Sequence, residues 1–560
     1  MKDRRLQNGL CSVATALNVS ISKSADPFCL LQSIAATCGV ALGDDGLLMA
    51  DDCQESKSLF QPPNKRCKLA AKGGENKVLG KPDLPLSKPA VCLQDQSDKG
   101  AVSPEEWQNG CMLDWMLRPC TTHQFIKQHL DQRPLHISRQ KHQHYFDGLL
   151  TKADIQQLLK TQQLQYGTNV DVTSYINGQR TNLNYNGSES TDQLETVDAS
   201  TVMRRFNKES CSVRVLHPQR WVEPVYKLLS MLEDELRSPV GCNAYLTPPS
   251  SQGFAPHWDD IDAFVLQVEG SKRWRLYAPD DSADLLPRDS SRDFQEEELG
   301  KLLLDVTLHP GDLLYMPRGC IHQAQALPDA HSLHLTVSAN QHCCWADLFE
   351  LSLPRALQLA GEDCIGLRRS LPFDMSQYVG LIHEEEESAQ RNNFTTTAQQ
   401  MLQQVTKHMP LDTAADRMNV QFIQQRLPPY GLHRREERPD LEVSEKSKIT
   451  LVRPGIAAMT IEDGSVVLYH CLNNPRILHA SHRHDLAEHE SEDEQPDIVP
   501  GRLEFDVDYG EVLERILSAH GSKGISMGKL QRMLDDTDST VDLFALVGDL
   551  YSEGLVDLQA

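Results

Sequence analysis

The chain has 560 residues, of which 39% are hydrophobic and 24% are charged, and its formal net charge at pH 7 is -24. Length and composition are typical of a globular protein of about three or four domains, and the acidic balance argues against a general attraction to nucleic acids or anionic membranes. No apolar run approaches the ~18 residues of a membrane helix, and 15 scattered cysteines without a CxxC pair favour reduced thiols in the cytosol or nucleus.

Residues 1–104 are expected to form a disordered tail. They hold 13 Lys+Arg against 11 Asp+Glu, and no helical or strand periodicity persists in their second half. The mildly apolar start is too short and too interrupted to predict a secretory signal. The cluster PPNKRCKL, with Lys65, Arg66 and Lys68, is typical of a nuclear address.

Residues 105–345 are expected to form a domain made mostly of short strands. MLDWML and TTHQFIKQHLDQRPL have helical spacing, whereas NVDVTSYING, SCSVRVLH, AFVLQVEG, KRWRLYAP and GDLLYMP read as strands separated by turn residues. Many short strands with occasional helices predict a jelly-roll type of β-sandwich or barrel, within a multidomain α+β chain.

Residues 346–430 are expected to be helical, from the patterns of DLFELSLPRALQLA and SAQRNNFTTTAQQMLQQVTKHM. A last unit, 431–560, begins with KSKITLVRPGIAAMTIEDGSVVLYHCL, which predicts two or three strands. The stretch 485–497 contains seven carboxylates and is interpreted as an acidic loop.

The end of the chain has a winged-helix pattern. VLERILSA and SMGKLQRML are amphipathic, VDLFALVGDLYSEG is helical, and a strand is expected to start at Leu555. A winged helix suggests DNA binding, but residues 502–560 hold 5 Lys+Arg against 12 Asp+Glu. Such a surface repels phosphates, so a protein-interaction or structural role is favoured and direct nucleic-acid binding is not expected.

Two segments have the spacing of a metal site. GFAPHWDDIDAFVLQVEG places His257 and Asp259 two residues apart before an apolar strand, so both side chains can reach one cation. In GDLLYMPRGCIH, a strand is expected over 312–315, a tight turn over 317–319, and His322 at the start of the returning strand. Two His and one carboxylate on one side of a metal suit non-haem Fe(II) with open positions. Zinc is the alternative metal.

The two segments resemble the metal motifs of the JmjC branch of the cupin superfamily. YLTPPSSQGFAPHWDDIDAFVLQVEGSKRWRLY, QRPLHISR and CSVRVLHPQ are similar to the family of nucleolar JmjC ribosomal oxygenases of animals, which are also described as bifunctional lysine-specific demethylases and histidyl-hydroxylases. The resemblance covers roughly residues 105–560. It implies a JmjC-type double-stranded β-helix (jelly roll), then a helical dimerisation region over 346–430, then a winged helix.

The resemblance also implies roles for single residues. Lys272 would pair with the far carboxylate of 2-oxoglutarate, which needs a cation when buried; the alternative is a surface lysine in a turn. Asn243, Tyr245, Ser338 and Arg214 match positions that line the substrate pocket in the family. Ordinary strand packing and pairing is the alternative for Tyr245 and Arg214, and packing alone could require the small Ser338.

One position departs from the family pattern. Trp258 stands between the two ligands where Tyr is expected. Because its neighbours point toward the metal, its side chain is expected to point away. We therefore expect an altered rim and unaltered chemistry.

The expected cofactors are Fe(II), 2-oxoglutarate as cosubstrate and molecular oxygen. The first hypothesis is hydroxylation of a histidine in a large-subunit ribosomal protein, favoured by hydroxyl and amide groups that can hold an imidazole. The second is demethylation of a histone methyl-lysine by a chromatin regulator and transcriptional repressor, which would favour an aromatic cage. The third is a non-catalytic chromatin or ribosome-assembly scaffold. A homodimer in the nucleus, in nucleolus and nucleoplasm, is expected.

Overall fold

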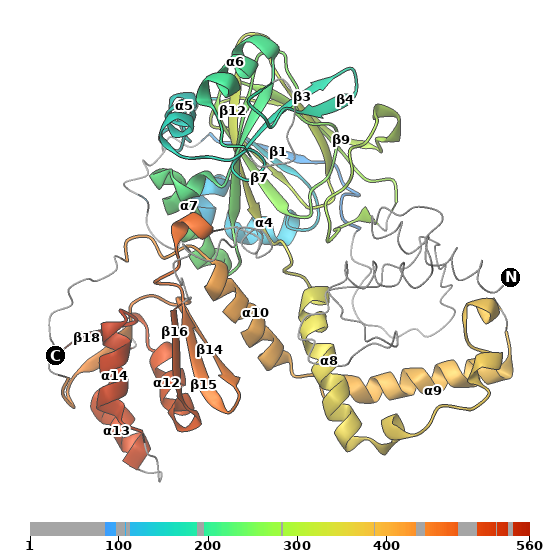
Figure 1. The fold of residues 1–560 in the computed structure, drawn as a ribbon, viewed down its shortest axis with the longest axis vertical. Coiled ribbons are helices and arrows are strands. Elements are labelled where there is room, and N and C mark those ends of the chain that lie inside the picture. The colour runs from blue at the N-terminus through green and yellow to red at the C-terminus, as the bar shows by residue number, and fades with distance from the viewer. Residues whose placement is uncertain are drawn as a thin grey trace. The chain divides into compact units, whose positions relative to one another are not determined.

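The computed structural model describes residues 84–96, 107, 112–187, 195–281, 284–385, 387–432, 443–479, 501–521, 524–535 and 541–559 (Figure 1). The basic cluster around Arg66 and the acidic stretch 485–497 lie outside these residues, as does most of the expected tail. None of the helices in the described part combines the length and the hydropathy that a membrane crossing requires.

A nine-stranded sheet forms the centre of the first domain, in the order β1-β2-β10-β7-β12-β6-β5-β3-β4. Its strands are β1 (Val91–Gln94), β2 (Leu135–Ser138), β3 (Val170–Ile176), β4 (Gln179–Asn182), β5 (Ser212–Leu216), β6 (Gly241–Thr247), β7 (Asp262–Glu269), β10 (Leu313–Met316) and β12 (Ser332–Ala339). A three-stranded sheet has the order β11-β8-β9, with β8 (Lys272–Tyr277), β9 (Leu302–Leu308) and β11 (Ile321–Ala326).

The two sheets pack against each other through a buried apolar cluster. Val265 of β7 and Leu314 of β10 come from the large sheet, while Trp274, Leu276 and Leu308 come from β8 and β9. Alternate residues of each strand therefore point into the space between the sheets. This two-sheet arrangement confirms the expected mixed domain built around short strands.

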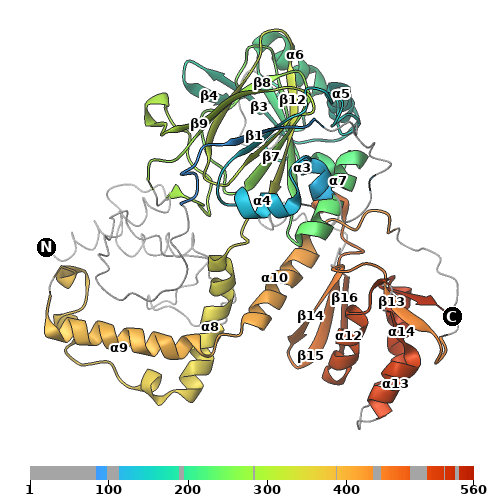
Figure 2. The ribbon, with the colours of Figure 1, turned by 180° about the vertical axis from the view of Figure 1, so that it is seen from behind.

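The opposite face of the large sheet packs on helices. Its buried residues, such as Ala244, Leu246 and Val337, share one core with α3 (Met112–Leu117), α4 (Thr122–Gln128), α5 (Lys152–Thr161), α6 (Ala199–Glu209) and α7 (Glu223–Leu236). Figure 2 shows α3, α4 and α7 side by side on this part of the domain. The face of the large sheet that contacts the helices is therefore apolar. Polar side chains of the large sheet lie on its other face, which is turned toward the three-stranded sheet.

Strand β1 corrects the expected extent of the disordered tail, because it lies within residues 1–104. It pairs in parallel with β2, with Val91 opposite Leu135. Asp95 follows it and forms a fully buried ion pair with Arg139 at 3.8 Å. A four-residue strand is too short to show a clear alternation of apolar and polar residues, and its partner strand is distant in the sequence. The composition of the surrounding residues therefore led to the incorrect prediction of disorder at β1.

The helical expectation for residues 346–430 is confirmed as secondary structure. The long helices are α8 (Trp345–Asp363), α9 (Ala389–Thr406) and α10 (Leu411–Gln425), and short 3-10 turns lie between α8 and α9. Helix α10 also supplies Val420, Phe422 and Ile423 to the core of the last domain. The last domain therefore includes a helix that precedes its expected start at residue 431.

The last domain contains two three-stranded sheets, β17-β13-β18 and β14-β15-β16. Its elements are β13 (Lys448–Leu451), β14 (Ala457–Glu462), β15 (Ser465–His470), β16 (Gly501–Asp506), α12 (Gly510–Leu517), β17 (Ile525–Ser526), α13 (Met527–Asp535), α14 (Leu543–Ser552) and β18 (Val556–Gln559). The three terminal helices and the strand after them are present where the sequence pattern predicted them.

Helix α7 joins the first and last domains through buried charges. Asp234 binds Arg426 at 2.5 Å and Arg453 at 3.0 Å. Glu233, which is fully buried, lies 3.0 Å from Nε2 of His479 and accepts a hydrogen bond from the backbone of Leu427 at 2.8 Å. Buried charges of this kind are tolerated only when each is paired, so these contacts define one docking geometry.

Candidate metal centre

Main-chain hydrogen bonds join the two segments that carry the expected ligands. The N–H of His257 donates to the carbonyl of His322 at 3.2 Å, and the N–H of His322 donates back at 2.9 Å. Gly319 N–H donates to the carbonyl of Asp259 at 3.1 Å. The predicted turn over 317–319 is present, since Cys320 N–H donates to Pro317 O at 3.1 Å and Gly319 has a φ of 83°. Each ligand position is thus tied to the other segment.

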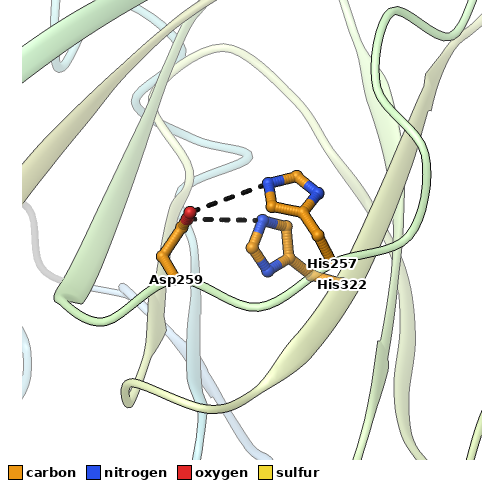
Figure 3. A group of neighbouring side chains, drawn as sticks. All are labelled: His257, Asp259 and His322. Carbon is orange, nitrogen blue, oxygen red and sulfur yellow. Dashed lines mark ion pairs between the residues drawn. The ribbon is translucent and has the colours of Figure 1, made fainter. Parts of the chain in front are cut away.

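The three side chains converge, as Figure 3 shows. One carboxylate oxygen of Asp259 lies 3.7 Å from Nε2 of His257, and the other lies 3.7 Å from Nε2 of His322. One ligand atom from each residue lies within 4.8 Å of the others. Atoms that each bind one ion at about 2.0–2.2 Å have separations of this size. The arrangement fits a single divalent cation held from one side.

Hydrogen bonds set the imidazole tautomers that a metal needs. Nδ1 of His257 lies 2.8 Å from the carbonyl of Ala255, and Nδ1 of His322 lies 3.1 Å from the carbonyl of Cys320. A carbonyl only accepts, so each Nδ1 carries the proton and each Nε2 keeps its lone pair toward Asp259. Burial lowers the pKa of His322, and the neighbouring His257 adds to the effect. The hydrogen bond and the lowered pKa both favour a neutral imidazole whose Nε2 can bind a metal ion.

Lys272 fits an anion site inside the sandwich. Its side chain is buried, and its ammonium donates to Oγ1 of Thr247 at 3.0 Å. No carboxylate pairs with it among the described residues, and burial lowers its pKa to about 7. A buried ammonium with one neutral partner is costly unless an anion arrives. Of the two interpretations of Lys272, the structure therefore excludes a surface lysine.

The expected substrate residues lie on the inner face of the large sheet. Tyr245 is paired across strands with Arg214 on one side and His334 on the other, and Ser338 lies opposite Gly241. Asn243 is two residues before Tyr245 and therefore on the same face. Its Oδ1 is buried without a hydrogen-bond partner, which leaves an acceptor available to a bound molecule.

Arg214 is engaged within the protein. Its guanidinium pairs with Asp171 of β3, and its guanidinium carbon Cζ lies 5.5 Å from the ring centre of Phe254. Burial opposes its charge, but Tyr245 and Asp171 outweigh burial and raise the pKa of Arg214. Ion pairing between strands is thus part of its role, and it positions Tyr245 from the neighbouring strand.

Three site residues were not assigned from the sequence. Thr247 holds Lys272, Phe254 packs edge-on against Tyr245 with ring centres 5.6 Å apart, and His334 stacks on Tyr245 at 4.9 Å. Burial lowers the pKa of His334 well below its usual value, and the Lys272 charge adds to this. The period-two alternation of β6 and β12 could have placed Thr247 and His334 on the same face as Tyr245 and Ser338, but it does not indicate which residues they contact.

The Trp258 side chain packs away from the ligands, as expected. Its ring lies 5.1 Å from that of Phe294, and its Nε1–H donates to the carbonyl of Asp289 at 3.3 Å. Its backbone N–H donates to Oγ of Ser291 at 2.9 Å. The loop 289–294 therefore holds the ligand-bearing segment from its outer side.

Known proteins resemble the chain over most of its length. A family model described as JmjC domain matches residues 214–346. "Ribosomal oxygenase 1" of Gallus gallus is 34% identical over 461 residues, which are 80% of this chain and 71% of that protein. "Bifunctional lysine-specific demethylase and histidyl-hydroxylase NO66" of Dictyostelium discoideum is 34% identical over 467 residues, 82% of this chain and 85% of that protein.

Among solved structures, YcfD, a ribosomal oxygenase from Escherichia coli in complex with cobalt and 2-oxoglutarate, is similar with a TM-score of 0.36 and 14% identity. The match covers 81% of this chain and all of that one. The JmjC match contains all three converging side chains and Lys272.

Proposed function

Because this chain belongs to the family of JmjC ribosomal oxygenases, also named bifunctional lysine-specific demethylases and histidyl-hydroxylases, we propose that it hydroxylates a histidine of a large-subunit ribosomal protein. The reaction would use Fe(II), 2-oxoglutarate and molecular oxygen. The observation that carries the proposal is the His257–Asp259–His322 cluster, with the buried ammonium of Lys272 in the same sandwich.

The residues divide the work of binding between them. His257, Asp259 and His322 would hold Fe(II) from one side, and Lys272 would bind the far carboxylate of 2-oxoglutarate. Bound iron supplies oxygen activation and oxidation of a nearby C–H bond, coupled to decarboxylation of 2-oxoglutarate to succinate. Thr247 orients the ammonium of Lys272, so the cosubstrate is presented in one direction.

Side chains of the inner face would orient the substrate imidazole. Asn243 offers a buried acceptor to one ring N–H, and the hydroxyls of Tyr245 and Ser338 can donate to or accept from the other ring nitrogen. The stacked rings of Tyr245 and His334 form an apolar wall that excludes water. The main contribution of the protein is to place one C–H bond beside the metal.

Substitution of a ligand tests this function. His257→Ala and Asp259→Ala should each abolish substrate-coupled succinate formation, with circular dichroism and melting temperature near those of the unmodified chain. Bound iron, measured by mass spectrometry, should fall in parallel. Full activity of both variants would defeat the assignment.

Demethylation of a histone methyl-lysine is the second candidate, because that activity is named for the relative NO66. The cationic side chains beside Phe254 argue against demethylation. Phe254 already has the guanidinium of Arg180 at 4.6 Å and that of Arg214 at 5.5 Å from its ring centre. A methylated ammonium would meet two like charges there. Incubation with both peptides separates the two candidates, scored as a +16 mass shift on histidine or as formaldehyde release.

A non-catalytic scaffold is the third candidate. The intact ligand cluster and the uncompensated Lys272 oppose it, because a scaffold gains nothing from a buried ammonium that lacks an anion. Bound iron and 2-oxoglutarate turnover without substrate would decide; absence of both would favour the scaffold.

We further propose a homodimer formed through α8. Trp345, Phe349, Leu353 and Leu357 follow one another at intervals of four, and their side chains are 38–73% exposed. Ala356 and Ala360, which lie beside the last two residues of this stripe, are buried in a small cluster with Val405 of α9, so the rest of the stripe stays uncovered. An exposed apolar stripe of this length marks a protein interface, and a second copy of the chain would bury it symmetrically.

The proposed location is the nucleus, including the nucleolus, on the basis of the basic cluster at Lys65, Arg66 and Lys68 and the ribosomal substrate. Fluorescence microscopy of the tagged chain with these three residues replaced by Ala tests this. The winged-helix interpretation of the last domain, with its protein-interaction role, also stays a proposal; its acidic composition and its three helices support it.

A further inference from the structure

A solvent-open hollow of about 520 Å³ lies in the last domain. Residues from α12, β13, β17 and α13 and from the loops beside them line it. Four of its nine lining residues are basic, namely Lys446, Lys448, Arg515 and Lys529, and none is acidic. This concentration of positive charge is opposite in sign to the chain as a whole.

The local fold brings these basic groups together. Lys448 of β13 is paired across strands with Ser526 of β17. Gly524, just before β17, lies so close to β13 that an added Cβ would be 2.5 Å from Oγ1 of Thr450 and 2.7 Å from Cε of Lys448. Only glycine permits this approach, which sets β17 and the start of α13, with Lys529, against β13.

Two of the four basic groups, Lys446 and Lys529, are not neutralised by a carboxylate of the described residues. Both side chains are exposed. Arg515 lies 3.7 Å from Glu511, but both are exposed, so that pair is weak. The two exposed lysines, in a hollow whose lining residues include four basic and no acidic side chains, favour an anionic ligand.

We propose that this basic hollow binds the phosphate backbone of single-stranded RNA. Lysine ammonium groups act as mobile point charges that suit successive phosphates, whereas carboxylate recognition favours the rigid fork of arginine, which occurs here once. No aromatic side chain lines the hollow, so bases would not stack and binding would be independent of sequence. Hydroxyls of Ser518 and Ser526 add donors for phosphate oxygens.

The choice of RNA rests on the proposed function, because a ribosomal protein is surrounded by RNA phosphates in its assembled state. The hollow would hold such RNA while the oxygenase domain acts on the protein. The expectation from composition, that direct nucleic-acid binding is absent, averaged the charge of residues 502–560 and left out Lys446 and Lys448, which precede them.

Fluorescence anisotropy of the full chain with a labelled 12-nucleotide RNA of mixed sequence tests the proposal. Four phosphate contacts predict a slope of about -3 for log affinity against log salt. The double variant Lys446→Gln/Lys529→Gln should bind roughly 10-fold more weakly at 50 mM salt, with the slope reduced by about 1.4. Lys141→Gln/Lys160→Gln, which removes two exposed lysines of the oxygenase domain, should bind like the unmodified chain.

The assay needs no turnover, so its failure is distinguishable from failure of the proposed enzyme activity, which both double variants should retain. Equal loss of affinity in the two double variants would overturn the site. So would competition by a 12-residue polyglutamate as effective as that of unlabelled RNA, since it would indicate an acidic protein partner. Affinity at least 10-fold higher for single-stranded DNA of the same sequence would overturn the choice of RNA.

Discussion

His257 and His322 are joined by two main-chain hydrogen bonds, of 3.2 and 2.9 Å, that form an isolated antiparallel bridge. The bridge fixes the distance between the two imidazoles before any metal arrives, and their ring centres are 4.5 Å apart. The metal therefore meets a site whose two histidines need little rearrangement, which reduces the entropic cost of binding.

The turn at Gly319 should control metal affinity. In Gly319→Ala, the added Cβ would lie 2.6 Å from Cδ of Pro287, so the turn must shift and the hydrogen bond to the Asp259 carbonyl is lost. We expect roughly 10- to 100-fold weaker Fe(II) binding, measured by chelator competition. Gly464→Ala has the same kind of positive φ but no atom within 4 Å. It is the matched control, and weakened metal binding in that variant as well would point to general destabilisation.

Lys272 should make cosubstrate binding depend on pH. Burial lowers its pKa in the free protein to about 7, and a bound carboxylate favours its charged form. Above pH 7 binding must take up a proton, so the Kd for 2-oxoglutarate should rise by up to about tenfold per pH unit. Quenching of Trp274, which lies beside Lys272, can report binding to the anaerobic protein.

Two variants complete the Lys272 experiment. Lys272→Arg should bind without this pH dependence, because guanidinium stays protonated. Lys272→Ala should bind roughly 10- to 100-fold more weakly at pH 7, the loss expected for a hydrogen bond to a charged group. A flat pH profile in the unmodified chain would contradict the assignment of the anchor.

His136 should stabilise the fold at low pH. Burial opposes its charge, but Asp312, 3.7 Å from its Nε2, outweighs burial and raises its pKa to about 9. The folded-state pKa lies above the ordinary value, so the stabilisation is complete below pH 6.5 and is lost as the pH rises to 9. The free energy of unfolding should fall by at most about 3 kcal/mol over this range. Urea denaturation of His136→Asn should show a smaller fall.

The α8 stripe should determine the oligomeric state. Leu357→Glu places a charge on a side chain that is 56% exposed, at the C-terminal end of the proposed apolar stripe. We expect light scattering to change from dimer to monomer with little change in helicity. Ile461→Glu alters an apolar residue elsewhere that is 67% exposed, and this variant should remain a dimer. A dimer that survives Leu357→Glu would place the interface on another surface.

The metal ligands were predictable because each motif is local. Spacing of two puts His257 and Asp259 on one side, and a strand-turn-strand pattern returns His322 to the same place. The residues that contact Lys272 and Tyr245 were not predictable from the sequence. The alternation of a strand predicts which face a side chain lies on, but it does not predict which residues of other segments contact that face. Thr247 and Phe254 belong to this class.

The contacts between domains could not be predicted from the sequence for a related reason. The periodicity of α10 correctly indicated a helix, but Phe422 and Ile423 belong to the core of the following domain. Glu233 and His479 carry no pattern that relates them, yet they meet in the interior. Such contacts depend on how finished domains dock, which local propensity does not encode.

The short strand β1 has a consequence for any shortened form of this protein. It covers the outer side of β2, whose other side is occupied by β10. A chain trimmed to begin at residue 105 would leave the N–H and C=O groups of Leu135–Ser138 open to solvent. Such an edge recruits strands from other molecules, so the trimmed protein would tend to self-associate and precipitate while its catalytic groups remained in place.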